Sequence, residues 1–117
     1  MILVGEVGAE RTSVALFEAA GEDLRLLRAA SVANEEYPGL RGIVRRFAAE
    51  DLPRLSRACF VVAGRPPWPV DGAELAAATG LPEVEVVREA IAPAAGSARG
   101  RLSELARRAL GKGAEQA

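Results

Sequence analysis

The turn Gly5-Glu6-Val7-Gly8-Ala9-Glu10-Arg11 is the first place where this chain could hold a ligand. Gly5 and Gly8 lack a Cβ, so they could let the backbone approach a small molecule or a nucleotide closely. The turn also carries two carboxylates, Glu6 and Glu10. A single Gly-x-x-Gly pair is a weak signal on its own. A ligand-binding module without catalysis is one hypothesis that this segment leaves open.

The residues that most often perform acid–base or metal chemistry are scarce. The 117 residues include no histidine, which removes the commonest general base and metal ligand. The one cysteine, Cys59, excludes an intrachain disulfide and a multi-cysteine metal site. It lies in the apolar run Ala58-Cys59-Phe60-Val61-Val62-Ala63, so we interpret it as a small core residue. We therefore predict no metal site.

Charge and hydropathy exclude other classes of protein. The net charge is −1, with acidic and basic residues interspersed, so nothing indicates a nucleic-acid partner. No segment approaches the roughly 20 apolar residues of a membrane span. The first six residues lack the basic region of a signal peptide. We expect one cytoplasmic domain that does not contact a membrane.

Hydrophobic patterning predicts the elements that would position the turn. Apolar residues at 40, 43, 44 and 47 share one face of a helical period. Asp71 is placed to cap a second helix, which ends at Thr79 before Gly80. The predicted order is βββαβαβ, with a turn at 19–23 and strands at Ile2–Val7, Arg11–Glu18, Leu24–Val32, Arg57–Ala63 and Glu83–Val87.

A further helix is predicted in the tail. Gly111 is expected to end it, and its apolar stripe is Leu102, Leu105, Ala106, Ala109 and Leu110. The basic residues of the tail are interpreted as a solvent-facing side, which comprises Arg99, Arg101, Arg107, Arg108 and Lys112. We divide the chain into a lobe at 1–95 and a helix and tail at 96–117 that packs on the same domain.

Three segments resemble bacterial glucokinases, which belong to the actin/hexokinase superfamily. Residues 1–18 are similar to the opening hairpin of those enzymes, Tyr37-Pro38-Gly39-Leu40 to the segment before a helix, and Arg57–Gly64 to a later buried strand. The resemblance covers residues 1–92. It implies an α/β fold, the ribonuclease H-like/actin-like N-terminal lobe, with a five-stranded mixed sheet flanked by helices and a C-terminal helix. That last helix is either the returning helix of the family or a generic closing helix.

At the phosphate loop the resemblance implies lost function. The family's second glycine and threonine align with Ala9 and Glu10, and its asparagine aligns with Arg11. A carboxylate at Glu10 would repel a triphosphate in a poorly screened site. Glu6 keeps the acidic character of the family's aspartate and could touch Mg²⁺, although a lone glutamate there is more often solvent-facing or ion-paired. With only Gly8 left in this degenerate loop, we expect no cofactor, neither ATP nor magnesium.

The positions for the general base and for the sugar also depart from the family. The family's base, the aspartate of an Asn-Asp-Phe motif, aligns with Glu89, and its asparagine aligns with Arg88. The extra methylene of glutamate moves the carboxylate by ~1 Å, a displacement worth roughly two orders of magnitude in rate. Trp68 matches a tryptophan near the sugar pocket, but Pro66 and Pro67 offer no side-chain hydrogen bond to a sugar.

We therefore predict that this chain alone is not a kinase. The first hypothesis is a non-catalytic glucokinase-like lobe, a binding, regulatory or structural subunit that meets a protein partner or a second copy of itself. Its substituted strand-end residues would form a charged former active site or a docking patch; these are Glu10, Arg11, Arg88 and Glu89. The alternative is the N-terminal lobe of a split ATP-dependent sugar kinase. A relic without selected activity is also left open.

Overall fold

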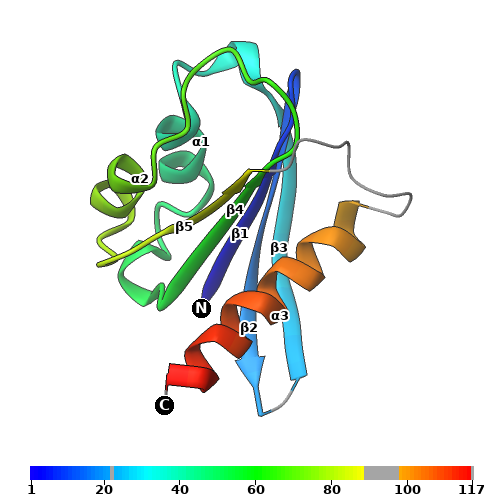
Figure 1. Cartoon of the computed structure of the whole chain (residues 1–117), viewed down its shortest axis with the longest axis vertical. Coiled ribbons are helices and arrows are strands. Elements are labelled where there is room, and N and C mark those ends of the chain that lie inside the picture. The colour runs from blue at the N-terminus through cyan, green and yellow to red at the C-terminus, as the bar shows by residue number, and fades with distance from the viewer. Residues whose placement is uncertain (22, 89–97, 117) are drawn as a thin grey trace.

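A five-stranded mixed sheet is the centre of the structure (Figure 1). The computed structural model describes residues 1–21, 23–88 and 98–116. Its strands are β1 (Ile2–Val7), β2 (Arg11–Ala20), β3 (Asp23–Ala33), β4 (Arg57–Val62) and β5 (Glu85–Arg88). They lie in the order β3-β2-β1-β4-β5, with β1, β2 and β3 antiparallel and with β4 and β5 parallel to β1. The predicted α/β class and five-stranded mixed sheet are confirmed.

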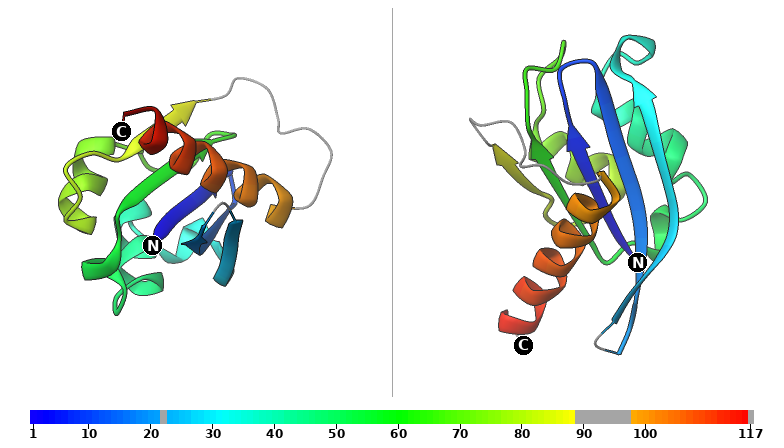
Figure 2. Two further views of the ribbon diagram at one scale, coloured as in Figure 1. Left: turned by 90° about the horizontal axis from the view of Figure 1, so that it is seen from below. Right: turned by 90° about the vertical axis from the view of Figure 1, so that its right-hand side faces the viewer.

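Helices cover both faces of this sheet (Figure 2). The helices α1 (Leu40–Phe47) and α2 (Gly72–Thr79) pack on one face, and α3 (Ala98–Gln116) crosses the other. Short 3₁₀ turns at Asn34–Glu36 and Leu52–Arg54 lie on either side of α1 in the chain. The order of strands and α-helices before α3 is the predicted βββαβαβ.

Strand β1 is buried on both sides, as its nearly continuous apolar run predicts. Successive side chains alternate between the two faces of the sheet. Leu3 and Val7 belong to the core beneath α1 and α2, whereas Ile2 and Val4 belong to the core beneath α3. The same alternation places Glu6 on the face that α3 covers. Cys59 is 0% exposed in the α3 core, which confirms its interpretation as a core residue.

The predicted helix boundaries at α1 and α2 are confirmed, because local interactions determine them. Asp71 caps α2 by accepting a hydrogen bond from the Ala73 N–H at 2.9 Å. Gly80 ends that helix with a φ of 78°, a left-handed conformation that glycine adopts without strain. In α1, the stripe residues Leu40, Ile43 and Val44 are buried.

Several predicted boundaries are wrong. β3 differs from the prediction by one residue at each end and β4 by one residue at its carboxyl end, and β5 begins at Glu85 and ends at Arg88 instead of spanning 83–87. The turn expected at 19–23 is shorter, because Ala19 and Ala20 pair with Leu24 and Asp23 and so continue the hairpin. Gly21, with a φ of 65°, allows this tighter reversal. Gly111 does not end the last helix, which continues to Gln116. A glycine lowers helix propensity by about 1 kcal/mol, and this penalty alone does not end a helix.

Candidate functional site at the carboxyl edge of the sheet

The predicted site residues that the structure describes gather at one edge of the sheet. The carboxyl ends of β1, β4 and β5 lie side by side there, since Val7 pairs with Val62, and Val62 with Arg88. Strand β2 runs antiparallel to β1, so the β1–β2 turn at 8–10 and Arg11 lie at this edge too. Ligands of α/β proteins commonly bind outside the carboxyl ends of parallel strands. Glu89 lies outside the described residues.

Glu6 is bound by an arginine of the last helix. Arg101 Nε donates to Glu6 Oε2 at 2.6 Å, and Arg101 Nη2 donates to Glu6 Oε1 at 2.9 Å. The Glu6 side chain is only 12% exposed and that of Arg101 is 28% exposed. The hydrogen bonds to Glu6 raise the pKa of Arg101 above its usual value, against the opposing effect of burial. Both carboxylate oxygens of Glu6 therefore face a guanidinium in this structure.

This pair corrects the interpretation of Arg101 as part of a solvent-facing side, because Arg101 binds Glu6. Arg107 and Arg108 are exposed, as predicted. Arg108 also forms a 3.1 Å ion pair with Glu85 of β5, and its side chain is 54% exposed. The side chains at 99 and 112 lie outside the described part. Arg101 lies one residue before Leu102, the first residue of the apolar stripe of α3. When this stripe packs on the sheet, Arg101 is brought close to the sheet as well.

A buried asparagine holds the β1–β2 turn. Asn34 is 1% exposed, and its Nδ2 donates to the Gly8 carbonyl at 2.8 Å. Its backbone N–H donates to the Glu10 carbonyl at 2.8 Å, and its Oδ1 accepts from Thr12 Oγ1 at 2.6 Å. The turn is thus tied to the segment that follows β3. The sequence alone does not indicate this role, because a polar residue after a strand is typical of an ordinary loop.

The two glycines of the turn have structural explanations. A Cβ on Gly5 would lie 2.5 Å from the Phe60 ring, and one on Gly8 would lie 2.9 Å from the Arg11 carbonyl oxygen. The Gly8 N–H donates to that same carbonyl at 2.9 Å, so the hairpin itself uses this donor. Gly64 follows β4, and a Cβ there would lie 3.0 Å from the Ala9 nitrogen. Close packing therefore accounts for the Gly-x-x-Gly spacing.

The charged residues of this edge point to several different partners. Arg11 turns toward β3, where it donates to Ser31 Oγ at 3.1 Å and to the Ser31 carbonyl at 3.0 Å. Arg88 Nη2 donates to the Val70 carbonyl at 2.5 Å. Glu10 is exposed in the turn, next to the exposed Ala9. The described residues of this edge thus form no single cluster.

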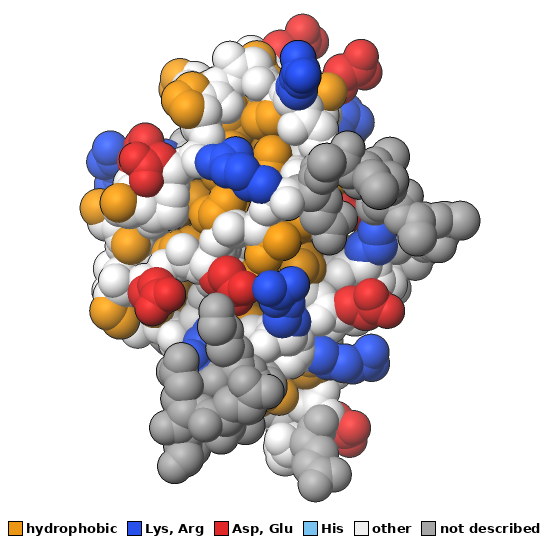
Figure 3. Space-filling view, in the orientation of Figure 1, with side chains coloured by type: hydrophobic (Ala, Val, Ile, Leu, Met, Phe, Trp, Pro, Cys, Tyr) orange, Lys and Arg blue, Asp and Glu red, His pale blue; other side chains and the backbone are white. Residues whose placement is uncertain are grey.

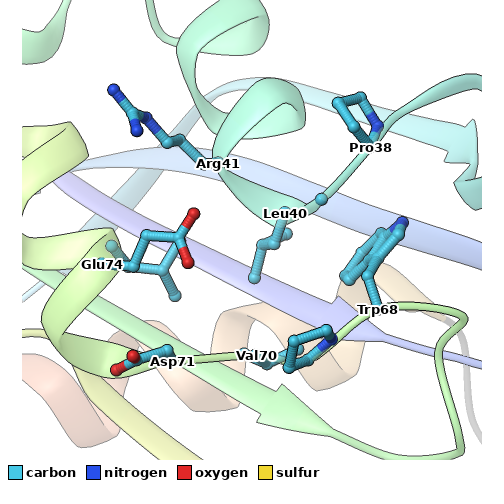
Figure 4. Close-up of a pocket in the computed structure, with 10 residues that line it drawn as sticks. Pro38, Leu40, Arg41, Trp68, Val70, Asp71 and Glu74 are labelled. Atoms are coloured by element: carbon cyan, nitrogen blue, oxygen red, sulfur yellow. The ribbon is translucent and has the colours of Figure 1, made fainter.

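Trp68 is anchored on the α1–α2 side of the sheet. Its Nε1 donates to the Tyr37 carbonyl at 3.1 Å and approaches the Asn34 carbonyl at 3.4 Å. The half-buried ring lines a small hollow of about 80 Å³ between α1 and α2 (Figure 4). Figure 4 also shows Arg41 and Glu74 at its rim. Small-molecule sites usually have 300–1,000 Å³, so this hollow is too small for a sugar or a nucleotide.

A larger, open hollow of about 410 Å³ lies at the carboxyl edge itself. It is lined by Val62, Gly64, Arg65, Pro66, Pro67, Trp68, Pro69, Val70 and Arg88.

Among the described residues, no group of three or more histidine, cysteine, aspartate or glutamate side chains could hold a metal ion. The helices in that part of the chain are also too short or too polar to cross a membrane.

The family model for glucokinase matches residues 3–117. The chain belongs to the glucokinase family. A solved glucokinase from an Antarctic psychrotroph superposes on this family member with a TM-score of 0.56 and 21% sequence identity. The match covers 74% of the present chain and 31% of that glucokinase. This likeness confirms the predicted fold, the N-terminal lobe of the actin/hexokinase type.

More remote neighbours include the Aquifex aeolicus Ppx/GppA phosphatase, with 10% identity, a TM-score of 0.47, and coverage of 74% of this chain and 35% of that one. Comparison with curated proteins gave no match. This glucokinase-family chain spans about a third of the length of the solved glucokinase.

Proposed function

We propose that this glucokinase-family lobe is non-catalytic and acts as a binding, regulatory or structural subunit of a homo- or hetero-oligomer. The observation that carries the proposal is the two-point contact between Glu6 and Arg101. Glu6 stands where the family resemblance places the acidic residue that could touch Mg²⁺. Here an arginine from α3 takes both of its oxygens.

The contact opposes metal binding because the two uses of Glu6 exclude each other. Charge-assisted, two-point arginine–carboxylate bonds are about twice as strong as neutral hydrogen bonds. Mg²⁺ is usually held by one or two carboxylates together with substrate phosphates, and it loses its water reluctantly. A metal at Glu6 would have to displace Arg101 and leave its guanidinium without this partner, in a position where the side chain is 28% exposed.

The β1–β2 turn adds a second obstacle to a nucleotide. The Gly8 N–H already donates within the hairpin, so it is not available to a phosphate. Glu10 adds a negative charge to the turn. Two like charges 4 Å apart repel by about 4 kcal/mol at an effective dielectric constant of 20. Together with the Glu6 contact, this repulsion supports a role other than phosphoryl transfer.

The edge of the sheet is a place where this lobe could associate with another chain. Strand β3 is an edge strand of 11 residues, and long edge strands can pair with another chain. Light scattering on the purified protein tests the homo-oligomer directly. Co-purification from the source cells, followed by reconstitution from the two purified proteins, tests the hetero-oligomer. A monomer that forms neither complex would contradict the subunit role.

Thermal melts with Mg-ATP and with glucose test the non-catalytic part of the proposal. A ligand at 100 times its Kd stabilises a protein by about 2.7 kcal/mol. In a domain of this size that would raise the Tm by roughly 10 °C. We expect no such shift and no phosphoryl transfer to glucose. A saturable shift with Mg-ATP, or measurable transfer, would overturn the proposal.

The alternative, the N-terminal lobe of a split ATP-dependent sugar kinase, has one observation in its favour. Asn34 holds the β1–β2 turn through three hydrogen bonds, so the turn keeps a defined shape beside the carboxyl edge. This alternative predicts that the unmodified protein gives a saturable Tm shift with Mg-ATP, and that Arg101→Ala, which releases Glu6, does not weaken it. The non-catalytic proposal predicts no shift in the unmodified protein.

A further inference from the structure

We propose that the hollow between β4, β5 and the proline-rich loop 65–69 binds a small organic anion, a carboxylate or phosphate monoester with an apolar body. We call this hollow the Arg65–Arg88 hollow; it is the 410 Å³ hollow described above. The proposal goes beyond the subunit role and does not depend on whether Glu6 can bind a metal. It rests on the charge, the lining and the rigidity of this part of the molecule.

Two arginines give the hollow its charge. Arg88 ends β5 and lies beside Val62 of β4 in the sheet, and Arg65 follows Val62 by three residues. The described residues that line the hollow include both arginines and no acidic residue. Glu89, which follows Arg88, lies outside the described part. Two cations favour an anion, and guanidinium groups match the planar, two-point geometry of carboxylates and phosphates.

The Arg88 guanidinium is already oriented. Its Nη2 donates to the Val70 carbonyl at 2.5 Å. A guanidinium has five N–H donors, so this bond fixes its position and leaves other donors for a ligand. Arg65 is exposed, so it can turn toward a bound anion. One fixed and one adaptable cation would thus meet the head group of the ligand.

The remaining lining is apolar. Val62 and Val70 are 5% and 4% exposed, and the half-buried Trp68 and three prolines complete the lining. Prolines have no backbone N–H, so the loop offers few donors to a sugar-like ligand. In the upper half of the face that Figure 3 draws, exposed apolar atoms lie beside basic side chains. A ligand with an anionic head and an apolar body fits such a lining better than a neutral polyol does.

The hollow is also rigid and well placed. Trp68 is anchored by its bond to the Tyr37 carbonyl, and the ring of each proline restricts φ. A preformed site loses little entropy when a ligand binds. The hollow of about 410 Å³ is wide open to solvent, so a ligand would lie on it partly exposed. Its position outside the carboxyl ends of two parallel strands is typical of ligand sites in α/β proteins.

Trp68 gives the experiment its readout, since it is the one tryptophan of the chain and it lines the hollow. Phenyl phosphate, benzoate and neutral benzyl alcohol are titrated while the tryptophan fluorescence is recorded at constant ionic strength. For ligands of this size we expect a saturable change with the two anions and a Kd on the order of 1 mM. Benzyl alcohol is expected to give no saturable change.

Matched variants assign the binding to the hollow. Arg65→Gln and Arg88→Gln are each expected to weaken phenyl phosphate binding about tenfold, which corresponds to the loss of one charge-assisted contact. Arg46→Gln, on the exposed last turn of α1, is expected to leave the Kd unchanged. Far-UV circular dichroism and thermal melts verify that each variant is folded. If Arg88→Gln fails to fold, the exposed Arg65 decides the outcome on its own.

Three results would overturn the proposal: benzyl alcohol binding as tightly as the anions, Arg46→Gln weakening binding as much as Arg65→Gln, or no saturable signal with either anion. The response to Mg-ATP separates this proposal from the non-catalytic function, because Glu6 and Arg101 do not line the hollow. A saturable Mg-ATP response of the unmodified protein, together with phenyl phosphate binding that Arg65→Gln weakens, would overturn only the non-catalytic function. Loss of phenyl phosphate binding in Arg65→Gln, with no Mg-ATP response in any variant, would support both.

Discussion

Arg101 and Glu6 lie 95 positions apart in the chain and form a two-point ion pair on the face of the sheet that α3 covers. The pair joins the beginning of α3 to the carboxyl end of β1, beside the turn where the family resemblance places its phosphate loop. The position of α3 and the availability of Glu6 are therefore coupled. A substitution at either residue will leave the charge of the other without this ion pair.

The first prediction concerns the strength of this pair. In a double-mutant cycle with Glu6→Gln and Arg101→Gln, we expect a coupling free energy on the order of 1 kcal/mol. The pair is partly exposed, so solvent screening keeps the value well below that of a fully buried pair. Urea unfolding of the four proteins measures it.

A second ion pair provides the control for that cycle. Arg25 and Glu18 are joined at 3.1 Å, but their side chains are 71% and 49% exposed. Glu18→Gln with Arg25→Gln should give a coupling near zero, because exposed pairs gain little in water. Equal coupling free energies for the two pairs would mean that the Arg101–Glu6 pair stabilises the protein no more than an exposed surface ion pair does.

The second prediction concerns the asparagine that holds the turn. Asn34→Ala should lower the free energy of unfolding by about 2–4 kcal/mol, because the Gly8 carbonyl and the Thr12 hydroxyl both lose their partner in a buried place. Chemical denaturation measures the loss. Ser13→Ala, one residue along β2 from Thr12, is the control and should change stability by less than ~0.5 kcal/mol.

The third prediction tests why Gly5 is a glycine. Gly5→Ala should destabilise the protein by about 1–3 kcal/mol, because the new Cβ would lie 2.5 Å from the Phe60 ring. Gly39→Ala has no atom within 4 Å of the new Cβ and an extended φ of 175°, so it should be nearly neutral. In the Gly5→Ala background, Phe60→Leu should recover part of the lost stability, because the leucine side chain is smaller than that of phenylalanine. Additive effects of these two substitutions would refute the steric explanation.

The fourth prediction concerns the packing of α3 on the sheet. Leu102 is 3% exposed in the core that Ile2, Val4 and Phe17 share with the helix. Leu102→Ala should cost about 2–4 kcal/mol, through lost burial and the cavity that remains. Glu104→Ala, on the exposed side of α3, should be neutral within ~0.5 kcal/mol. A neutral Leu102→Ala would mean that α3 contributes little to the stability of the lobe.

Much of the framework could be predicted because short-range patterns encode it. The apolar run of β1, the stripe of α1, and the cap and stop of α2 at Asp71 and Gly80 each depend on a few neighbouring residues. The boundary errors have the same origin. Pairing between Ala20 and Asp23 extends the hairpin past a segment rich in turn residues, and helix formation continues past Gly111.

The candidate site was predictable in position but not in its contacts. Strand order brings the turn at 8–10 and Arg88 to one edge, as expected for this topology. Local sequence does not reveal that Asn34 holds the turn or that Arg101 meets Glu6. Those contacts join residues 26 and 95 positions apart, and they exist only once the sheet has formed and α3 has packed on it.

The sequence by itself determined the class of fold, the family, and the loss of the small residues around Gly8, because residue types and spacing carry that information. Only the tertiary structure decided the state of Glu6. A glutamate in a turn can be solvated, bound to metal or ion-paired, and the choice depends on which charge the fold brings within about 3 Å of it. Here the packing of α3 brings Arg101 to that place.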